Sequence, residues 1–188
     1  MKLTYGTPLE RRLLSAAFVA ASVFSAGFLW WQRVFTLPYL GLSLYFFLCG
    51  LLILRLPLPS GSPTAASRNL YRFLPALLLM GAIFLGSTFS VSSGVSFSVR
   101  DIYIHFAEFF ALGLLTARMV NPFNRRDAVL PSTLLAVGVV AVFGALDEIH
   151  QAFVPGRNPD FGDLGWDVTG GLAGSLAYLL LALRRDGA

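Results

Sequence analysis

The stretch that decides the fold is 129–153, VLPSTLLAVGVVAVFGALDEIHQAF. No charged residue precedes Asp147 in it, and its length suits a membrane-crossing helix, which needs about 20 mostly apolar residues. A soluble helix of this length would carry charged residues on one face at every turn. We therefore predict a transmembrane helix whose C-terminal end carries a cluster of polar groups.

Five other segments have a similar length and apolar character. They are residues 13–31, 34–54, 73–89, 102–119 and 164–183. A cleaved signal peptide is the alternative for the first segment, but its apolar run exceeds the 7–15 residues typical of such a core, as a rough guide. We predict an all-α fold, a multi-pass transmembrane bundle of about six helices.

The composition supports a membrane protein of one domain's length. Of the 188 residues, 56% are hydrophobic and 13% are charged, against about 25% charged in an ordinary soluble domain. The net charge of +4 could suggest a nucleic-acid partner, but the 14 basic residues sit in short clusters between apolar segments, so we expect no nucleic acid. The single Cys49 excludes a disulfide framework.

The basic clusters predict the orientation. Along the chain they hold three, one, three, one, three, one and two residues, which puts eleven on one side of a six-helix bundle and three on the other. Cytoplasmic loops carry the excess of Lys and Arg. Both termini are therefore predicted to be cytoplasmic, with Arg33, Arg100 and Arg157 on the opposite side.

Polar residues interrupt the apolar pattern at three places, all on the predicted extracytoplasmic side. Seven of the ten acidic residues and both histidines belong to these places. The candidate site residues are Asp101, His105, Glu108, Asp147, Glu148, His150, Gln151, Arg157, Asp160, Asp163 and Asp167. The first three are spaced i, i+4, i+7 and share one helical face. Ionisable residues inside a membrane are costly and mark functional sites by default, although a network that only holds helices together is the structural alternative.

Residue type assigns the candidates to roles. The catalytic candidates are His105, Glu108, Asp147, Glu148 and His150, because a histidine oriented by a carboxylate can move a proton near neutral pH. The two histidines with their carboxylates could instead bind zinc or manganese. No H-E-x-x-H pattern is present, so a divalent metal is a candidate cofactor that the sequence leaves undecided.

The substrate-binding candidates centre on Arg157, the basic residue of the loop after 129–153, which suits an anion such as phosphate. The others are Asp101, Gln151, Asp160, Asp163 and Asp167. Gly170, Gly171 and Gly174 are predicted to allow close helix packing.

Two blocks resemble the VanZ-like family. They are Asp101-x-x-x-His105-Phe-x-Glu108-Phe-x-x-x-Gly113-Leu and Asp147-Glu148-x-His150-Gln151-x-Phe-x-Pro155-Gly156-Arg157-x-x-Asp160-x-x-Asp163-x-x-x-Asp167. The resemblance covers about residues 73–183. It implies a protein of the bacterial cytoplasmic membrane, linked to the cell envelope and to teicoplanin resistance. It also implies a division into an N-terminal two-helix hairpin, residues 1–70, and a four-helix core, residues 71–188.

Three functions are compatible with this sequence. The leading hypothesis is a membrane hydrolase or transferase that acts on a lipid-linked envelope precursor or a phospholipid head group at the outer leaflet. The second is a protein that binds the head group or the antibiotic without chemistry. The third is a proton-linked transporter, in which buried acids and histidines relay protons.

Overall fold

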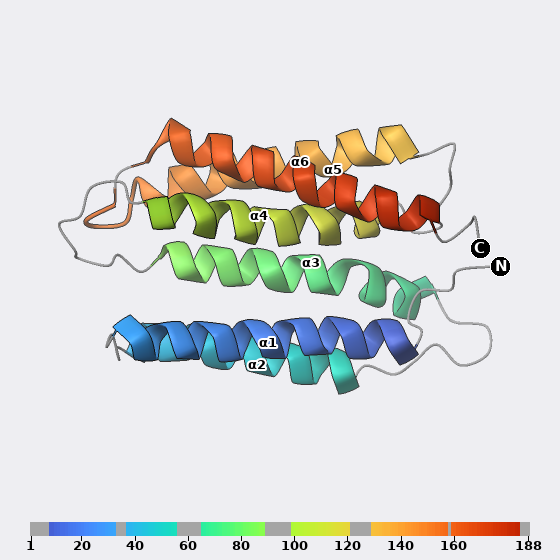
Figure 1. The fold of residues 1–188 in the computed structure, drawn as a ribbon, viewed down its shortest axis with the longest axis horizontal. Helices are drawn as coiled ribbons and strands as arrows, with labels where there is room; N and C mark the ends of the chain where they lie inside the picture. The colour runs from blue at the N-terminus through green and yellow to red at the C-terminus, as the bar shows by residue number, and fades with distance from the viewer. Residues whose placement is uncertain are drawn as a thin grey trace. The chain divides into compact units, whose positions relative to one another are not determined.

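The computed structural model describes residues 8–32, 37–55, 65–88, 99–120, 129–157 and 159–184. Within these ranges the chain forms six α-helices and no strand, which confirms the all-helical prediction (Figure 1). The helices are α1 Pro8–Gln32, α2 Leu37–Arg55, α3 Ala65–Ser87, α4 Val99–Val120, α5 Val129–Gln151 and α6 Phe161–Arg184.

The backbone contacts divide the chain between Gly86 and Ser87 into two compact units. The N-terminal unit holds α1, α2 and nearly all of α3, and the C-terminal unit holds Ser87, Thr88, α4, α5 and α6. The sequence analysis instead grouped residues 71–188 as one core, and that division into functional domains stays a prediction.

In the N-terminal unit, small residues let α1 and α2 pack closely. Ser15 Oγ donates to the carbonyl oxygen of Gly50 at 2.8 Å, and Ser22 Oγ donates to that of Ser43 at 2.7 Å. A Cβ on Gly50 would lie 2.8 Å from Val19 Cγ2. Small side chains and hydroxyl-to-carbonyl bonds are the contacts that hold helices together where no hydrophobic force acts between them.

In the C-terminal unit, α4 and α6 cross at glycines. A Cβ on Gly113 would collide with the backbone of Gly171, and one on Gly174 would collide with the carbonyl group of Phe110. Ser175 Oγ donates across the same contact to the carbonyl oxygen of Gly113 at 3.2 Å. The prediction that these glycines permit close packing is confirmed, and only a residue without a side chain allows this approach.

The polar residues of the C-terminal unit lie at one of its ends. The N-terminal ends of α4 and α6 and the C-terminal end of α5 all lie at one end of the C-terminal unit (Figure 1). Phe109 of α4 is fully buried and its ring centroid lies 6.1 Å from that of Phe143 on α5. Apolar packing therefore fills the middle of the unit, and the polar cluster occupies its end.

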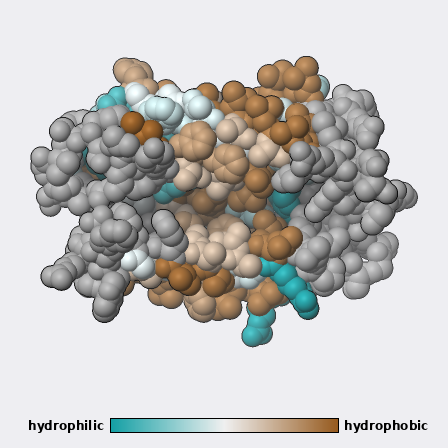
Figure 2. Space-filling view, viewed as in Figure 1, coloured by the Kyte–Doolittle hydropathy of each residue, from teal (hydrophilic) through white to brown (hydrophobic). Residues whose placement is uncertain are grey.

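The outer face of α5 is apolar. Among the described residues, one stretch, Leu130–Gln151, is long and apolar enough to cross a membrane, and Ser43–Arg55 and Arg72–Ser87 are apolar but shorter. Large apolar side chains stay exposed along α5: Leu130, Leu134, Leu135, Val142, Leu146 and Ile149. Figure 2 shows that most described side chains on the face in view are hydrophobic. A continuous exposed apolar surface marks contact with lipid or with another protein.

Candidate functional site

A histidine and an aspartate form the central contact of the site. His105, one turn and a half into α4, and Asp167, at a similar depth in α6, place Nδ1 and Oδ1 2.9 Å apart. Asp167 is fully buried, and the side chain of His105 is only 12% exposed. The Nε2 atom of His105 lies 3.9 Å from Asp163 Oδ2, which is one helical turn before Asp167. The same histidine therefore faces two carboxylates of α6, one on each ring nitrogen.

Asp147 on α5 is held by two donors. Ser87 Oγ donates to its Oδ1 at 2.6 Å, and Gln151 Nε2 donates to its Oδ2 at 2.9 Å. All three side chains are buried. Hydrogen bonds to an ionised acceptor are stronger than neutral ones, so these donors fix the orientation of the carboxylate.

Glu148, the next residue, faces the loop between α5 and α6. The backbone N–H of Asp160 donates to its Oε2 at 2.8 Å, and Gln151 Nε2 makes a longer contact of 3.4 Å with its Oε1. Arg157 Nη1 donates to Gln151 Oε1 at 3.3 Å. The amide of Gln151 thus links both carboxylates of α5 to the arginine of the loop.

The loop gives Asp160 a structural role. Its Oδ1 accepts a hydrogen bond from the backbone N–H of Gly162 at 2.7 Å, and its backbone oxygen accepts from the N–H of Asp163 at 3.1 Å. An aspartate immediately before the first helical residue, with these contacts, is an N-cap. Gly156 turns the loop with a φ of 82°, a conformation that residues with a Cβ rarely adopt.

The structure does not bring every candidate into one group. His150 Nε2 lies 3.1 Å from Thr88 Oγ1, so this histidine contacts the residue after α3. Glu108 is close enough to His105, Asp147, Asp167 and Arg157 to interact with them electrostatically. Asp101 lies in the first turn of α4, and its side chain is outside the described part of the chain.

Three side chains have the spacing of a metal site. One ligand atom each of His105, Glu148 and Asp167 lies within 4.8 Å of the others. The sequence analysis paired His105 with His150 for such a site, whereas the residues that meet it here are carboxylates of α5 and α6.

Sequence reasoning missed Thr88 and Gly144. Thr88 carries no charge and lies beyond any recognised motif, so nothing marked it as the partner of His150. Gly144 lies one turn before Glu148, and a Cβ there would lie 3.1 Å from Asp167 Oδ2. A glycine at helical spacing from a polar cluster is the one signal that could have found it. Ser87 was not among the sequence candidates either, and here it donates to Asp147.

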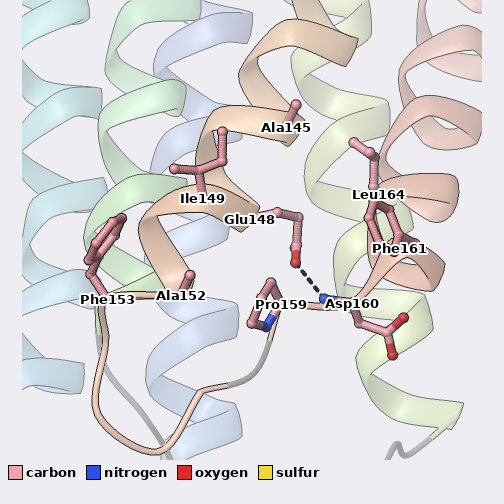
Figure 3. A pocket seen from close by; sticks show the side chains of 9 residues that line it. All are labelled: Ala145, Glu148, Ile149, Ala152, Phe153, Pro159, Asp160, Phe161 and Leu164. Atoms are coloured by element: carbon pink, nitrogen blue, oxygen red, sulfur yellow. Dashed lines mark hydrogen bonds between the residues drawn. The ribbon is translucent and has the colours of Figure 1, made fainter.

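An open apolar pocket adjoins Glu148 (Figure 3). Its volume is about 420 Å³, and its lining is Ala145, Glu148, Ile149, Ala152, Phe153, Pro159, Asp160, Phe161 and Leu164. Phe153 and Phe161 are 81% and 92% exposed at its rim. The pocket therefore joins an apolar surface to one carboxylate of the polar cluster.

These features define a class: a helical protein with an apolar flank that keeps a histidine and several carboxylates at one end. The chain matches the model of the VanZ/LLP1 family over residues 16–182. It therefore belongs to that family, and the match begins within α1, well before residue 73 where the resemblance in the sequence begins. Proteins of this family are typically membrane proteins, and the family carries a general link to glycopeptide resistance. No curated protein and no solved structure matches the chain.

Proposed function

We propose that this chain is a multi-pass protein of the bacterial cytoplasmic membrane and an enzyme, a hydrolase or transferase. Its substrate is the phosphate-bearing head group of a phospholipid or a lipid-linked envelope precursor at the extracytoplasmic leaflet. The observation that carries the proposal is the buried contact of His105 with Asp167, at the same end of the unit as Arg157 and the apolar pocket.

The parts of the site suit this chemistry. An apolar pocket open at its rim accepts part of a hydrocarbon chain, and Arg157 supplies the cation that an anionic head group requires. The pair of His105 and Asp167 activates the attacking water or hydroxyl, since a carboxylate that orients an imidazole strengthens it as a base. Asp163 Oδ2 lies 3.9 Å from the Nε2 atom of the same ring, and Glu108 is close enough to interact with the pair electrostatically.

Two observations support the proposed membrane topology. The alternating basic clusters favour an orientation with the Arg157 end outside the cytoplasm, and the exposed apolar stripe of α5 is suited to lipid contact. The polar cluster then stands at the depth of the lipid head groups, where a phosphate is accessible from the outer leaflet.

The direct test is turnover by the purified full-length protein in lipid nanodiscs. Bacterial phospholipids and a polyprenyl diphosphate are supplied separately, and released phosphate or head group is measured. We expect His105→Gln to reduce turnover by more than about 100-fold, a typical contribution of a general acid or base. Gly138→Ala is the matched control, since nothing lies within 4 Å of a Cβ at that position of α5.

The outcomes separate the three functions. Turnover that survives His105→Gln contradicts the proposed role of this residue. Head-group binding without turnover in the wild type supports the non-catalytic binding protein instead. His150→Gln reports on the second predicted catalytic histidine, and because its ring contacts Thr88, we expect a loss below about tenfold.

Sidedness is tested with single cysteines in a Cys49→Ser background. We expect Pro155→Cys, in the exposed loop before Arg157, to react with a membrane-impermeant maleimide on intact cells. Arg12→Cys, an exposed position near the start of α1, should react only after the cells are permeabilised. The reverse pattern would contradict the proposed orientation.

A further inference from the structure

We propose that His105, Glu148 and Asp167 bind one divalent transition-metal ion, of the zinc or manganese type. The three residues come from α4, α5 and α6, so the ion would join all three helices of the C-terminal unit. Metal binding stands on these contacts alone and is measured without any substrate, so it can fail or succeed independently of the proposed reaction.

The spacing of the ligand atoms fits one ion. The three atoms lie within 4.8 Å of one another. Bonds of about 2.0–2.2 Å to zinc allow two ligand atoms to lie at most about 4.4 Å apart. Side-chain movements of a few tenths of an ångström therefore bring all three ligand atoms within bonding distance of one ion. One imidazole and two carboxylates are ligands that both zinc and manganese accept.

Asp167 supplies the second observation. It is 0% exposed, and its Oδ2 has no hydrogen-bond partner among the described residues. A buried carboxylate oxygen without a partner is unfavourable, and a bound cation is one of the ways in which proteins compensate it. Oδ2 faces Gly144. Gly144 and Glu148 are one turn apart on α5 and share a helical face, so Oδ2 points toward the helix face that carries the next ligand.

Glu148 is oriented as a metal ligand would be. Asp160 N–H donates to its Oε2 at 2.8 Å, and its Oε1 makes the longer contact of 3.4 Å with Gln151. The residue is 7% exposed. Outer-shell hydrogen bonds of this kind fix the ligating oxygen and are a regular feature of metal sites.

His105 lies between two carboxylates. The separation of 3.9 Å between its Nε2 and Asp163 Oδ2 is too long for a hydrogen bond. Nδ1 and Asp167 Oδ1, 2.9 Å apart, are close enough to bind the same ion once Nδ1 gives up its proton, and Nε2 then carries the proton and faces Asp163. The carboxylates of Asp147 and Asp163 add negative charge around the ion.

A bound ion would also serve the proposed reaction. With three protein ligands, one position is left for water, as in catalytic zinc sites. An ion here would supply a nucleophilic water near neutral pH and polarise a phosphoryl oxygen, and His105 would then act as its ligand in place of the general base. Arg157 and the apolar pocket would then place the substrate beside it.

The experiment uses the purified full-length protein, stripped of metal with a chelator and titrated with Zn²⁺ and with Mn²⁺ by calorimetry. We expect one ion per chain. Asp167→Asn and Glu148→Gln, which keep side-chain size, should each weaken binding by at least about tenfold. Asp160→Asn is the matched control, because asparagine caps a helix as well as aspartate does, and should bind as the wild type does.

A second measurement covers variants that fail to fold. In the wild type loaded with Mn²⁺, pulsed electron paramagnetic resonance should detect one imidazole nitrogen bound to the ion. Wild-type binding weaker than a Kd of about 1 mM, or equal losses in Asp160→Asn and Asp167→Asn, would overturn the proposal. Two bound imidazoles would overturn it as well, since that result requires His150.

Discussion

His105 and Asp167 are 62 residues apart in the sequence, and their side chains join α4 to α6 through a 2.9 Å contact between Nδ1 and Oδ1. The contact exists because α4 and α6 cross at Gly113 and Gly174, where side chains would hold the helices apart. The chemistry of the site therefore depends on a close helix contact that lies outside the polar cluster itself.

The first prediction concerns the proton on this histidine. In metal-free protein we expect His105 to carry a proton on Nδ1, because Asp167 Oδ1 accepts a hydrogen bond there. Nitrogen-15 nuclear magnetic resonance can follow it, since the chain has two histidines and His150→Gln leaves only the two ring nitrogens of His105. Asp167→Asn should weaken the preference for Nδ1, and Asp160→Asn should leave it unchanged. A neutral wild-type ring protonated at Nε2 alone would contradict the contact.

The second prediction concerns helix packing. Gly174→Ala places a Cβ against the Phe110 carbonyl group, and backbone cannot move aside as a flexible side chain can. We expect the unfolding free energy to fall by about 1–3 kcal/mol, the usual cost of overpacking. Gly165→Ala, in the same helix, meets nothing within 4 Å and should be neutral or stabilise by up to about 1 kcal/mol. Unfolding in detergent, followed by circular dichroism, compares the two.

The helices were predictable from the sequence because each rests on local information. Apolar runs of sufficient length gave their positions, and the predicted segment 129–153 became α5, Val129–Gln151. The gathering of His105, Glu148 and Asp167 at one end also followed, since alternating helix directions bring these ends together. Gly170, Gly171 and Gly174 signalled a close crossing in the same way.

The pairing of side chains was not predictable. The spacing of His105 and Glu108 on one helix suggested a local pair, but His105 contacts α6 instead. That choice depends on how far α4 rotates and slides against α6, which no local pattern encodes. The same holds for His150, whose partner Thr88 follows a different helix. Asp160 was predicted only as a substrate-binding residue, and the sequence analysis did not anticipate that its contact with Gly162 caps α6.

The third prediction concerns Gln151, whose amide donates to Asp147 and to Glu148. Gln151→Glu replaces the donor with a carboxylate beside two others in a buried place. We expect a loss of about 1–3 kcal/mol of unfolding free energy at neutral pH, the cost of buried groups left unsatisfied. Because a protonated glutamate can donate a hydrogen bond again, the loss should shrink at acidic pH. Gln151→Met, which cannot titrate, serves as control, and an equal pH dependence in both variants would contradict this explanation.

The fourth prediction concerns the apolar pocket beside Glu148. Ala145 lines it from α5, and Ala141, one turn earlier on the same helix, does not. If the pocket holds part of the lipid hydrocarbon, Ala145→Phe fills the space and should raise KM for a long-chain substrate by more than about tenfold. A water-soluble short-chain analogue, which needs less of the pocket, should be affected less. Ala141→Phe adds the same side chain outside the pocket and should leave the ratio of the two substrates unchanged. An equal rise in KM for both substrates in Ala145→Phe would mean that the pocket does not bind the hydrocarbon chain. The variant would then act by disturbing Glu148.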